Sequence, residues 1–515
     1  MKNMILNILI CVASCIIILF GVLLFMKFTK TSEDFSNTKL VIYEGPKSLR
    51  DATEEDLKAT NETQRDFSML HCVDTKVSVN GQDLYVYDTN VNHSRTWNNS
   101  YLPSISRTPI TYFDFEGKVK ITVTVPEREL NTVKVSPLSY GIEPEVDKDK
   151  KTVSFVIETP DTYTVTFDDS PARALHIFAN PLEKEEELPD FNDESVIYIG
   201  PGEWTIDSIS LESGQTLYIA GGAVVHSDIS ANFVKNVKVL GRGIIDGSQY
   251  EGWHGTLAHI PLKFDYADDS VIDGIIVTNP NAWCLQGYST KNLTVNNVKI
   301  VSCRPNGDGI TIQSCQDVNV TNCFVRSWDD SLVVKNYSEN TENVNFKNIQ
   351  VWTDLAQSME IGYETNKGSR ENSTLSNVTF EDITVLNNFH KPVISVHNAD
   401  NAVVSDIAFK NITVENCRVG SGDGSELPYL IDIAIVQNTN WSTTKDRGWI
   451  KDITIENVNV LGGEFVGSRI QGFDEEHTVT GVKIKNLNVL GKKIMSLEDG
   501  EFKVKEGTFS DVTFE

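Results

Sequence analysis

The sequence predicts an all-β protein whose larger part is a right-handed parallel β-helix, preceded by a small antiparallel β-sandwich domain and an N-terminal transmembrane or signal segment. Six-residue units of one pattern recur through the second half of the chain, and no stretch shows a sustained helical period. The part before the repeats alternates apolar and polar residues with period two. A solenoid also accounts for a length of 515 residues, which exceeds what one ordinary core holds.

The first element is an apolar segment, residues 4–26, which carries no charge. A helix of this length crosses a bilayer core of about 30 Å. We therefore expect residues 1–30 to be a signal anchor or signal peptide, with the body of the protein outside the cell. The protein is then membrane-anchored by this helix, or secreted if the segment is cleaved. Residues 31–70 are polar and charged, and we expect them to form a tether.

The second element, residues 71–185, contains short alternating segments separated by turns such as Asn80-Gly81. Such spacing indicates a small antiparallel β-sandwich. The expected strands are Lys76–Val79, Leu84–Tyr87, Val119–Val125, Val153–Ile157 and Tyr163–Phe167. The charged run 183–187 follows as a hinge.

The third element, residues 186–515, contains the repeats. Each unit has an apolar residue, an Asn or Asp at a bend, and an alternating strand, so that no unit can bury its apolar face without a stacked neighbour. The units are Val295–Ile300, Val320–Val325, Phe346–Val351, Phe380–Val385, Phe409–Val414, Ile455–Val460 and Ile484–Val489. Their starts are 25, 26, 34, 29, 46 and 29 residues apart, so the extra residues at 352–379 and 415–450 belong to loops.

Composition excludes some function classes. A formal net charge of −27 argues against a nucleic-acid partner, because a polyphosphate would be repelled. The eight cysteines show no CxxC pair and no zinc spacing. We expect buried thiols, with one disulfide between adjacent coils left open, and we predict neither a required metal nor a cofactor.

Three carboxylates mark a candidate active site. Asp308, in the sequence Asn-Gly-Asp-Gly, precedes Asp329 and Asp330 by 21 and 22 residues, close to one coil of a parallel β-helix. Coils lie about 4.8 Å apart, so the three side chains are expected to converge and to perturb one another's pKa values. One carboxyl that keeps its proton and others that stay ionised are what glycoside hydrolysis needs. The alternative is that these residues only cap turns.

At these residues the chain resembles a known family. Asn306-Gly-Asp-Gly309 followed by Trp328-Asp-Asp-Ser331 resembles the Asn-Thr-Asp and Gly-Asp-Asp motifs of glycoside hydrolase family 28, the polygalacturonases, and equally those of the dextranase-like family 49. The resemblance covers about 190–515. It implies that Asp329 is the general acid, that Asp308 and Asp330 activate the water, and that the anomeric configuration inverts.

Two departures from the pattern bear on the substrate. Gln357 stands near where polygalacturonases have an accessory His, and the Arg-Ile-Lys triplet that grips a uronic carboxylate is absent from the following coil. Both departures favour a neutral glycan. Stacked coils by themselves place carboxylates about 5 Å apart, a separation associated with retention, whereas the resemblance implies inversion.

Several neighbours are candidates for binding substrate. Lys335 either steers a sugar hydroxyl, holds Asp330 ionised or is a surface lysine, and tryptophans on successive coils either stack on sugar rings or pack in the core. The substrate-binding candidates are Asn306, Trp328, Lys335, Trp352, Gln357 and Glu360.

The sequence therefore predicts an extracellular inverting glycosidase that acts on a polysaccharide or oligosaccharide. Two alternatives remain open: a glycan-binding β-helix surface protein without catalysis, and a polysaccharide lyase, which would need Ca²⁺ and an acidic sugar. The sugar, the linkage, endo or exo action and the oligomeric state are not determined by the sequence.

Overall fold

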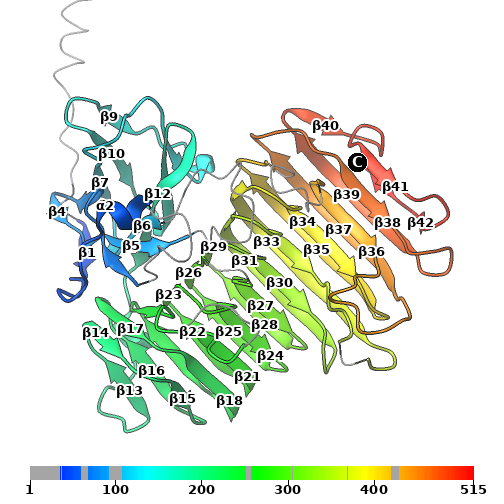
Figure 1. The fold of residues 1–515 in the computed structure, drawn as a ribbon, viewed down its shortest axis with the longest axis horizontal. Helices are drawn as coiled ribbons and strands as arrows, with labels where there is room; N and C mark the ends of the chain where they lie inside the picture. Colours follow the sequence, from blue (N-terminus) through cyan, green and yellow to red (C-terminus); the bar gives the residue numbers. More distant parts are fainter. Residues whose placement is uncertain are drawn as a thin grey trace, which may run out of the picture.

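The computed structural model describes residue 35 and residues 37–58, 68–91, 107–250, 257–303, 306–367, 369–418 and 428–515. Two sheets of the N-terminal part lie beside a long stack of strands that runs from the green to the red end of the chain (Figure 1). Helix is rare in the described residues: α2 (Glu54–Lys58) and two short 3-10 turns, Leu138–Tyr140 and Glu185–Glu187. The described part of the chain is therefore all-β, as the sequence predicts.

The N-terminal part has a seven-stranded and a five-stranded sheet that share one apolar core. The first consists of β1 (Lys39–Ile42), β2 (Leu70–His71), β5 (Tyr87–Asn90), β6 (Arg107–Glu116), β8 (Val133–Ser136), β11 (Asp161–Phe167) and β12 (Ser170–Pro181). The second consists of β3 (Lys76–Val79), β4 (Gln82–Asp83), β7 (Val119–Thr124), β9 (Glu145–Asp147) and β10 (Thr152–Ile157). The larger sheet is mixed rather than purely antiparallel, because β6 and β12 run parallel.

The stretch 31–70, expected as a polar tether, contains strand β1 and helix α2. Strand β1 pairs antiparallel with β6, and Lys39 forms an ion pair of 2.7 Å with Glu116 across this pair. The described part of the stretch therefore contributes to the sheet. Polarity alone does not reveal this, because an edge strand exposes alternate side chains to water.

Two parallel sheets form the rest of the chain. The eleven-stranded sheet contains β15 (Ile209–Leu211), β18 (Ile229–Lys235), β21 (Leu262–Asp268), β24 (Leu285–Tyr288), β27 (Ile310–Gln313), β30 (Leu332–Lys335), β32 (Met359–Ile361), β34 (Ile394–Asn398), β36 (Ile431–Ile435), β38 (Ser468–Gln471) and β41 (Phe502–Val504). Each of its strands pairs with the corresponding strand of the next coil. This pairing is that of a parallel β-helix.

The second parallel sheet has twenty strands. They are β13 (Val196–Ile199), β14 (Gly202–Thr205), β16 (Thr216–Ile219), β17 (Ala223–His226), β19 (Lys238–Gly241), β20 (Ile244–Asp246), β22 (Ser270–Asp273), β23 (Ile276–Thr278), β25 (Lys291–Asn296), β26 (Lys299–Val301), β28 (Gln316–Thr321), β29 (Phe324–Ser327), β31 (Thr341–Thr353), β33 (Thr374–Asn388), β35 (Val403–Val414), β37 (Trp449–Val460), β39 (Val479–Val489), β40 (Lys492–Ile494), β42 (Phe509–Ser510) and β43 (Thr513–Phe514). All its neighbours pair in parallel except β39 and β40.

The repeated units form the bends of this second sheet. The third residue of every unit, always Asn or Asp, is left-handed, with φ between 52° and 56°. Asn and Asp tolerate this conformation better than other residues with a side chain, which explains the repeated pattern. Their side chains bond from coil to coil, as from Asn348 Nδ2 to Asn322 Oδ1 at 2.8 Å, while Phe346, Phe380 and Phe409 stack in the core.

The N-terminal part packs against the solenoid through a second apolar cluster that joins Tyr87 and Phe178 to Phe324, Trp328 and Trp352. A cavity of about 640 Å³ lies along the same boundary, lined by residues of both parts. None of the three candidate aspartates lines it. The N-terminal part is therefore attached by a packed interface and not by a hinge alone.

The described cysteines are free, buried thiols. This agrees with the expectation of buried packing. The predicted membrane segment, 4–26, lies outside the described residues. None of the helices in the described part of the chain has the length and apolar character needed to cross a bilayer.

Candidate active site

The ladder of the eleven-stranded sheet brings two of the predicted aspartates to the same position on successive coils. The backbone N–H of Gly309 donates to the carbonyl of Asp330 at 2.8 Å, and Ile310 N–H donates to Ser331 O at 2.9 Å. Asp308 and Asp330 therefore stand one coil apart, directly before β27 and β30. Gln357 continues the series before β32, because Ser331 N–H donates to its carbonyl at 2.9 Å.

The third aspartate, Asp329, lies in a bend of the chain beside Asp330. Its Oδ2 accepts a hydrogen bond from Asn306 N–H at 3.0 Å, and its Oδ1 accepts one from Asp330 N–H at 3.1 Å. Asp330 Oδ1 accepts in turn from Gln357 N–H at 2.9 Å. Backbone donors thus fix both carboxylates, which are half-buried, while Asp308 is buried.

The carboxylates influence one another. Burial raises the pKa of Asp308 well above its usual range; the charge of Lys335 opposes this shift, and those of Asp329 and Asp330 add to it. Burial and the charges of Asp329 and Glu360 raise the pKa of Asp330 to about 7. The site can therefore hold a proton near neutral pH, which acid–base catalysis requires.

Lys335 lies inside this group. Its Nζ is 3.3 Å from Glu364 Oε2 and 3.9 Å from Asp308 Oδ2, and it lies 4.6 Å from the ring centre of Trp283. Burial lowers the pKa of Lys335, but Glu364 and Asp308 outweigh burial, so that it stays above its usual value. Lys335 is therefore charged, held between carboxylates and buried, so it is not a surface lysine.

Glu360 differs from the expectation that it binds a sugar hydroxyl. It is fully buried, and its carboxylate bonds to His397 Nδ1 at 2.8 and 3.0 Å. His397 Nε2 lies 3.0 Å from Asp432 Oδ2, and Arg469 pairs with the same carboxylate. Burial lowers the pKa of His397, yet Glu360 and Asp432 raise it to about 10. No local sequence pattern reveals this network, because its members come from four separate strands, β32, β34, β36 and β38.

The prediction that Trp328 and Trp352 bind substrate is wrong. Trp328 is 0% exposed and Trp352 is 1% exposed. Both belong to the cluster that holds the N-terminal part on the solenoid, and the guanidinium of Arg326 lies 4.5 Å from the ring centre of Trp352. These rings are packing residues and are not open to a sugar.

Asn306 and Gln357 contribute mainly through their backbones. Asn306 is left-handed, with φ of 58°, which directs its N–H to Asp329, and its Oδ1 accepts from Trp283 Nε1 at 3.3 Å. The side chain of Gln357 is buried. Both residues thus position the aspartates, a role that the sequence pattern does not indicate.

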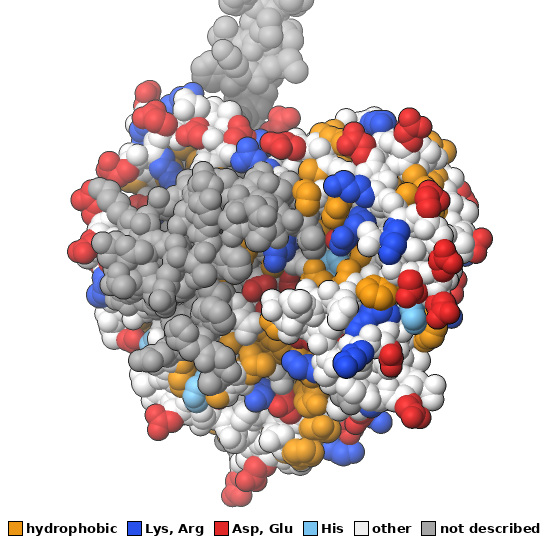
Figure 2. Space-filling view, turned by 45° about the vertical axis from the view of Figure 1, so that its right-hand side comes forward, with side chains coloured by type: hydrophobic (Ala, Val, Ile, Leu, Met, Phe, Trp, Pro, Cys, Tyr) orange, Lys and Arg blue, Asp and Glu red, His pale blue; other side chains and the backbone are white. Residues whose placement is uncertain are grey.

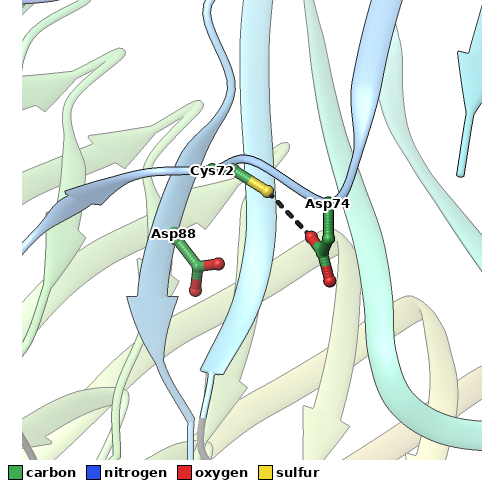
Figure 3. A group of neighbouring side chains, drawn as sticks. All are labelled: Cys72, Asp74 and Asp88. Carbon is green, nitrogen blue, oxygen red and sulfur yellow. Dashed lines mark hydrogen bonds between the residues drawn. The ribbon is translucent and has the colours of Figure 1, made fainter. Parts of the chain in front are cut away.

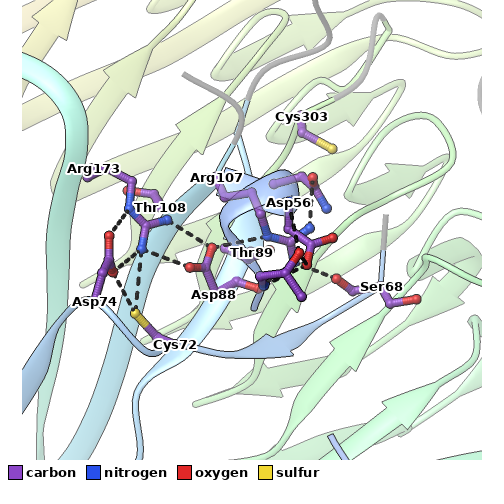
Figure 4. Close-up of polar contacts among 12 residues, drawn as sticks. Asp56, Ser68, Cys72, Asp74, Asp88, Thr89, Arg107, Thr108, Arg173 and Cys303 are labelled. Atoms are coloured by element: carbon purple, nitrogen blue, oxygen red, sulfur yellow. Dashed lines mark hydrogen bonds and ion pairs between the residues drawn. The ribbon is translucent and has the colours of Figure 1, made fainter. Parts of the chain in front are cut away.

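One group of ligand-type side chains lies elsewhere. In the described part of the chain, Cys72, Asp74 and Asp88 have ligand atoms within 4.8 Å of one another (Figure 3). The guanidinium of Arg173 is bonded to all three, with Nη1 3.0 Å from Asp88 Oδ1 and Nη2 3.5 Å from Cys72 Sγ (Figure 4). Arg107 adds a second bond to Asp88 at 3.1 Å. An arginine thus supplies the positive charge of this group, which is an ion-pair network inside the N-terminal sheets.

Acidic and basic side chains both lie on the visible face. Figure 2 shows several Lys and Arg side chains gathered to the right of the grey residues, with Asp and Glu side chains mainly toward the outer rim. The net charge of −27 therefore does not make this face uniformly acidic.

The chain is similar in sequence to a known protein family. Residues 208–505 match the sequence profile of the family described as "Glycosyl hydrolases family 28". A "Probable polygalacturonase" of Vitis vinifera is 22% identical over 360 residues, which span 59% of this chain and 69% of that protein. A "Polygalacturonase" of Brassica napus is 27% identical over 112 residues, 20% of this chain and 28% of its own length.

A solved structure, "Dex49A from Penicillium minioluteum", superposes with a TM-score of 0.56 at 14% identity. The alignment covers 93% of this chain and 98% of that one. At this identity the likeness shows a shared fold, which here extends over the N-terminal part as well as the solenoid.

Proposed function

The chain belongs to glycosyl hydrolases family 28, and we propose that it hydrolyses O-glycosidic bonds of a polysaccharide or oligosaccharide with inversion at the anomeric carbon. Asp329 serves as the general acid, and Asp308 and Asp330 together activate the water. The observation that carries this proposal is the placement of three mutually interacting carboxylates at one edge of adjacent coils. Membership of a hydrolase family favours neither the lyase nor the non-catalytic alternative.

The protonation pattern supports an acid–base mechanism. The pKa of Asp330 is about 7, so this carboxyl is ionised above neutral pH and can then act with Asp308 as the base, next to the general acid Asp329. Asp308 stands one coil from Asp330 in the same position, so the two carboxyls can hold a water molecule together. Two carboxyls about 5 Å apart are associated with retention. A third carboxyl leaves one residue as the acid and two to hold the water that inversion requires.

Proton NMR of the first-formed product tests the stereochemistry. We expect the anomer opposite to that of the substrate linkage to accumulate before mutarotation equalises the two forms. Retention, with a trapped glycosyl-enzyme, would instead make one aspartate a nucleophile and contradict the role of the base pair.

The pH dependence tests the role of Asp330. A base must be ionised, so we expect kcat/KM to rise with pH along a limb centred near 7. Lys335 lowers the pKa of both Asp308 and Asp330. Lys335→Met should therefore move this limb to higher pH, whereas Lys335→Arg, which keeps the charge, should leave it nearer its original place. An unchanged limb in Lys335→Met would contradict the assignment.

We further propose that the substrate is a neutral glycan. Two cations near the aspartates are already neutralised: Lys335 by Glu364, and His397 by Glu360 and Asp432. A uronic acid needs a cation that is free to receive it. Polygalacturonate is the second candidate substrate, because the relatives are named as polygalacturonases. Reducing-end release from dextran and from polygalacturonate, measured side by side, distinguishes the two.

The organisation of the chain completes the proposal. We propose an extracellular protein attached through residues 1–30, a sandwich domain that includes β1 and β2 and extends to residue 185, and a right-handed catalytic solenoid over 186–515. The charge-free stretch 4–26 and the rule that parallel crossovers are right-handed support these assignments.

A further inference from the structure

A row of aromatic rings follows the outside of the eleven-stranded sheet. Phe233 of β18 stacks on Tyr266 of β21, with ring centres 4.5 Å apart and planes at 6°. Tyr266 meets the edge of Tyr288 of β24 at 5.5 Å, and Tyr288 meets Tyr337, just after β30, at 6.2 Å. These four residues, the aromatic row, form one unbroken series of contacts.

The aromatic row is open to solvent, unlike the tryptophans that the sequence singles out. Phe233 is 73% exposed, and the three tyrosines are partly exposed. An apolar ring this exposed gains little from burial. A contiguous row of rings, one of them largely and three of them partly open to water, is the kind of surface that another molecule covers.

Backbone strain supports the same conclusion. Phe233 and Tyr266 are both left-handed, with φ of 54° and 52°, and they face each other where the pairing of β18 with β21 skips one residue on each strand. At the repeated bends the solenoid uses Asn or Asp for this conformation. A bulky aromatic side chain is disfavoured there, so strain retained at two adjacent positions points to a use for the rings.

The row leads directly to the candidate active site. Tyr337 donates its hydroxyl hydrogen to Glu364 Oε1 at 3.0 Å, Glu364 pairs with Lys335, and Lys335 pairs with Asp308. From β18 to β30 the row spans four coil steps, about 19 Å. That length suits a chain of sugars and exceeds a single one.

We propose that the aromatic row is a binding track for a polymeric glycan, which it guides to the aspartates. The apolar C–H faces of sugar rings pack against the aromatic rings, and the tyrosine hydroxyls bond to sugar hydroxyls. The binding track extends the proposed function to the binding of a long substrate. It rests on the proposed function only for the cleavage of the bound glycan at Asp308, Asp329 and Asp330. Its binding role is independent of hydrolysis.

The variant Phe233→Asn separates binding from stability. Asn suits the left-handed conformation, so this change relieves strain while it removes the ring. We expect an unchanged or higher thermal unfolding midpoint together with weaker glycan binding. A residue that serves only packing would lose stability and leave binding intact.

Binding is measured by affinity electrophoresis in gels that contain dextran or polygalacturonate, with every variant made in the full chain carrying Asp329→Asn. We expect Phe233→Asn and Tyr288→Ala each to weaken retardation by about 2- to 10-fold, the change that one aromatic contact contributes. Tyr198→Ala, which removes an exposed tyrosine from the other sheet, should bind like the parent.

If Phe233→Asn and Tyr288→Ala are retarded as strongly as the parent protein, the proposed binding track is wrong. It is also wrong if neither dextran nor polygalacturonate retards the parent protein. Because the Asp329→Asn background needs no turnover, these outcomes are independent of the hydrolysis assays. A chain that binds through the row but cleaves neither glycan would keep the track and count against the proposed function.

Discussion

Asp329→Asn is expected to lower kcat/KM on the polysaccharide substrate by about 10²- to 10⁴-fold, the range that a positioned general acid contributes. Asn has the same shape, and it can still accept from Asn306 N–H, so the fold should persist. Reducing-end assays measure the loss. Asp317→Asn makes the same chemical change at an exposed solenoid bend and should leave activity unchanged.

An activated substrate distinguishes the acid from the bases. A glycoside with an acidic phenol as leaving group departs without a proton, so Asp329→Asn should lose far less activity on it than on the polymer. Asp308→Asn and Asp330→Asn should lose activity on both, because they act on the water. If Asp330→Asn is the variant that the phenol glycoside rescues, then Asp330 is the acid, and the assignment of Asp329 is wrong.

The second large effect is expected on stability, at Arg326. This side chain is fully buried, 3.0 Å from Asp354 Oδ2, and its Nη1 lies 3.1 Å from His176 Nε2 of the N-terminal part. Arg326→Met leaves a buried carboxylate without its cation. Removal of one partner of a buried pair costs about 3–5 kcal/mol, so we expect the urea midpoint to fall accordingly.

A matched substitution on the surface supplies the control. Lys347 pairs with Glu381 at 3.0 Å, and both side chains are partly open to water. Exposed pairs contribute about 0–1 kcal/mol, so Lys347→Met should hardly move the midpoint. Similar losses in the two variants would contradict the expected cost of breaking the buried Arg326–Asp354 pair.

The repeats and the aspartates were predictable because both are local patterns. The Asn or Asp of each unit indicates a left-handed bend, and the interval of 22 residues from Asp308 to Asp330 equals one coil. Both follow from the stacking itself. The structure therefore places Asp308 and Asp330 in register, as the spacing predicts.

The environment of the tryptophans was not predictable in this way. Trp328 and Trp352 lie on coils near the site, but the N-terminal part covers them, and nothing in their own segments indicates this. The aromatic row was missed for the opposite reason. Phe233, Tyr266 and Tyr288 lie 33 and 22 residues apart and match no repeat, so only the pairing of the strands reveals them as neighbours.

The packed boundary between the two parts also constrains how such a chain evolves. Trp328 stands one residue before Asp329, and its ring is covered by the N-terminal sheets. A solenoid inherited without those sheets would expose apolar rings beside the candidate aspartates, and selection would have to replace them with polar residues. The two parts should therefore be lost or kept together, and a recombinant solenoid shortened at residue 186 would need redesign at these positions to stay in solution.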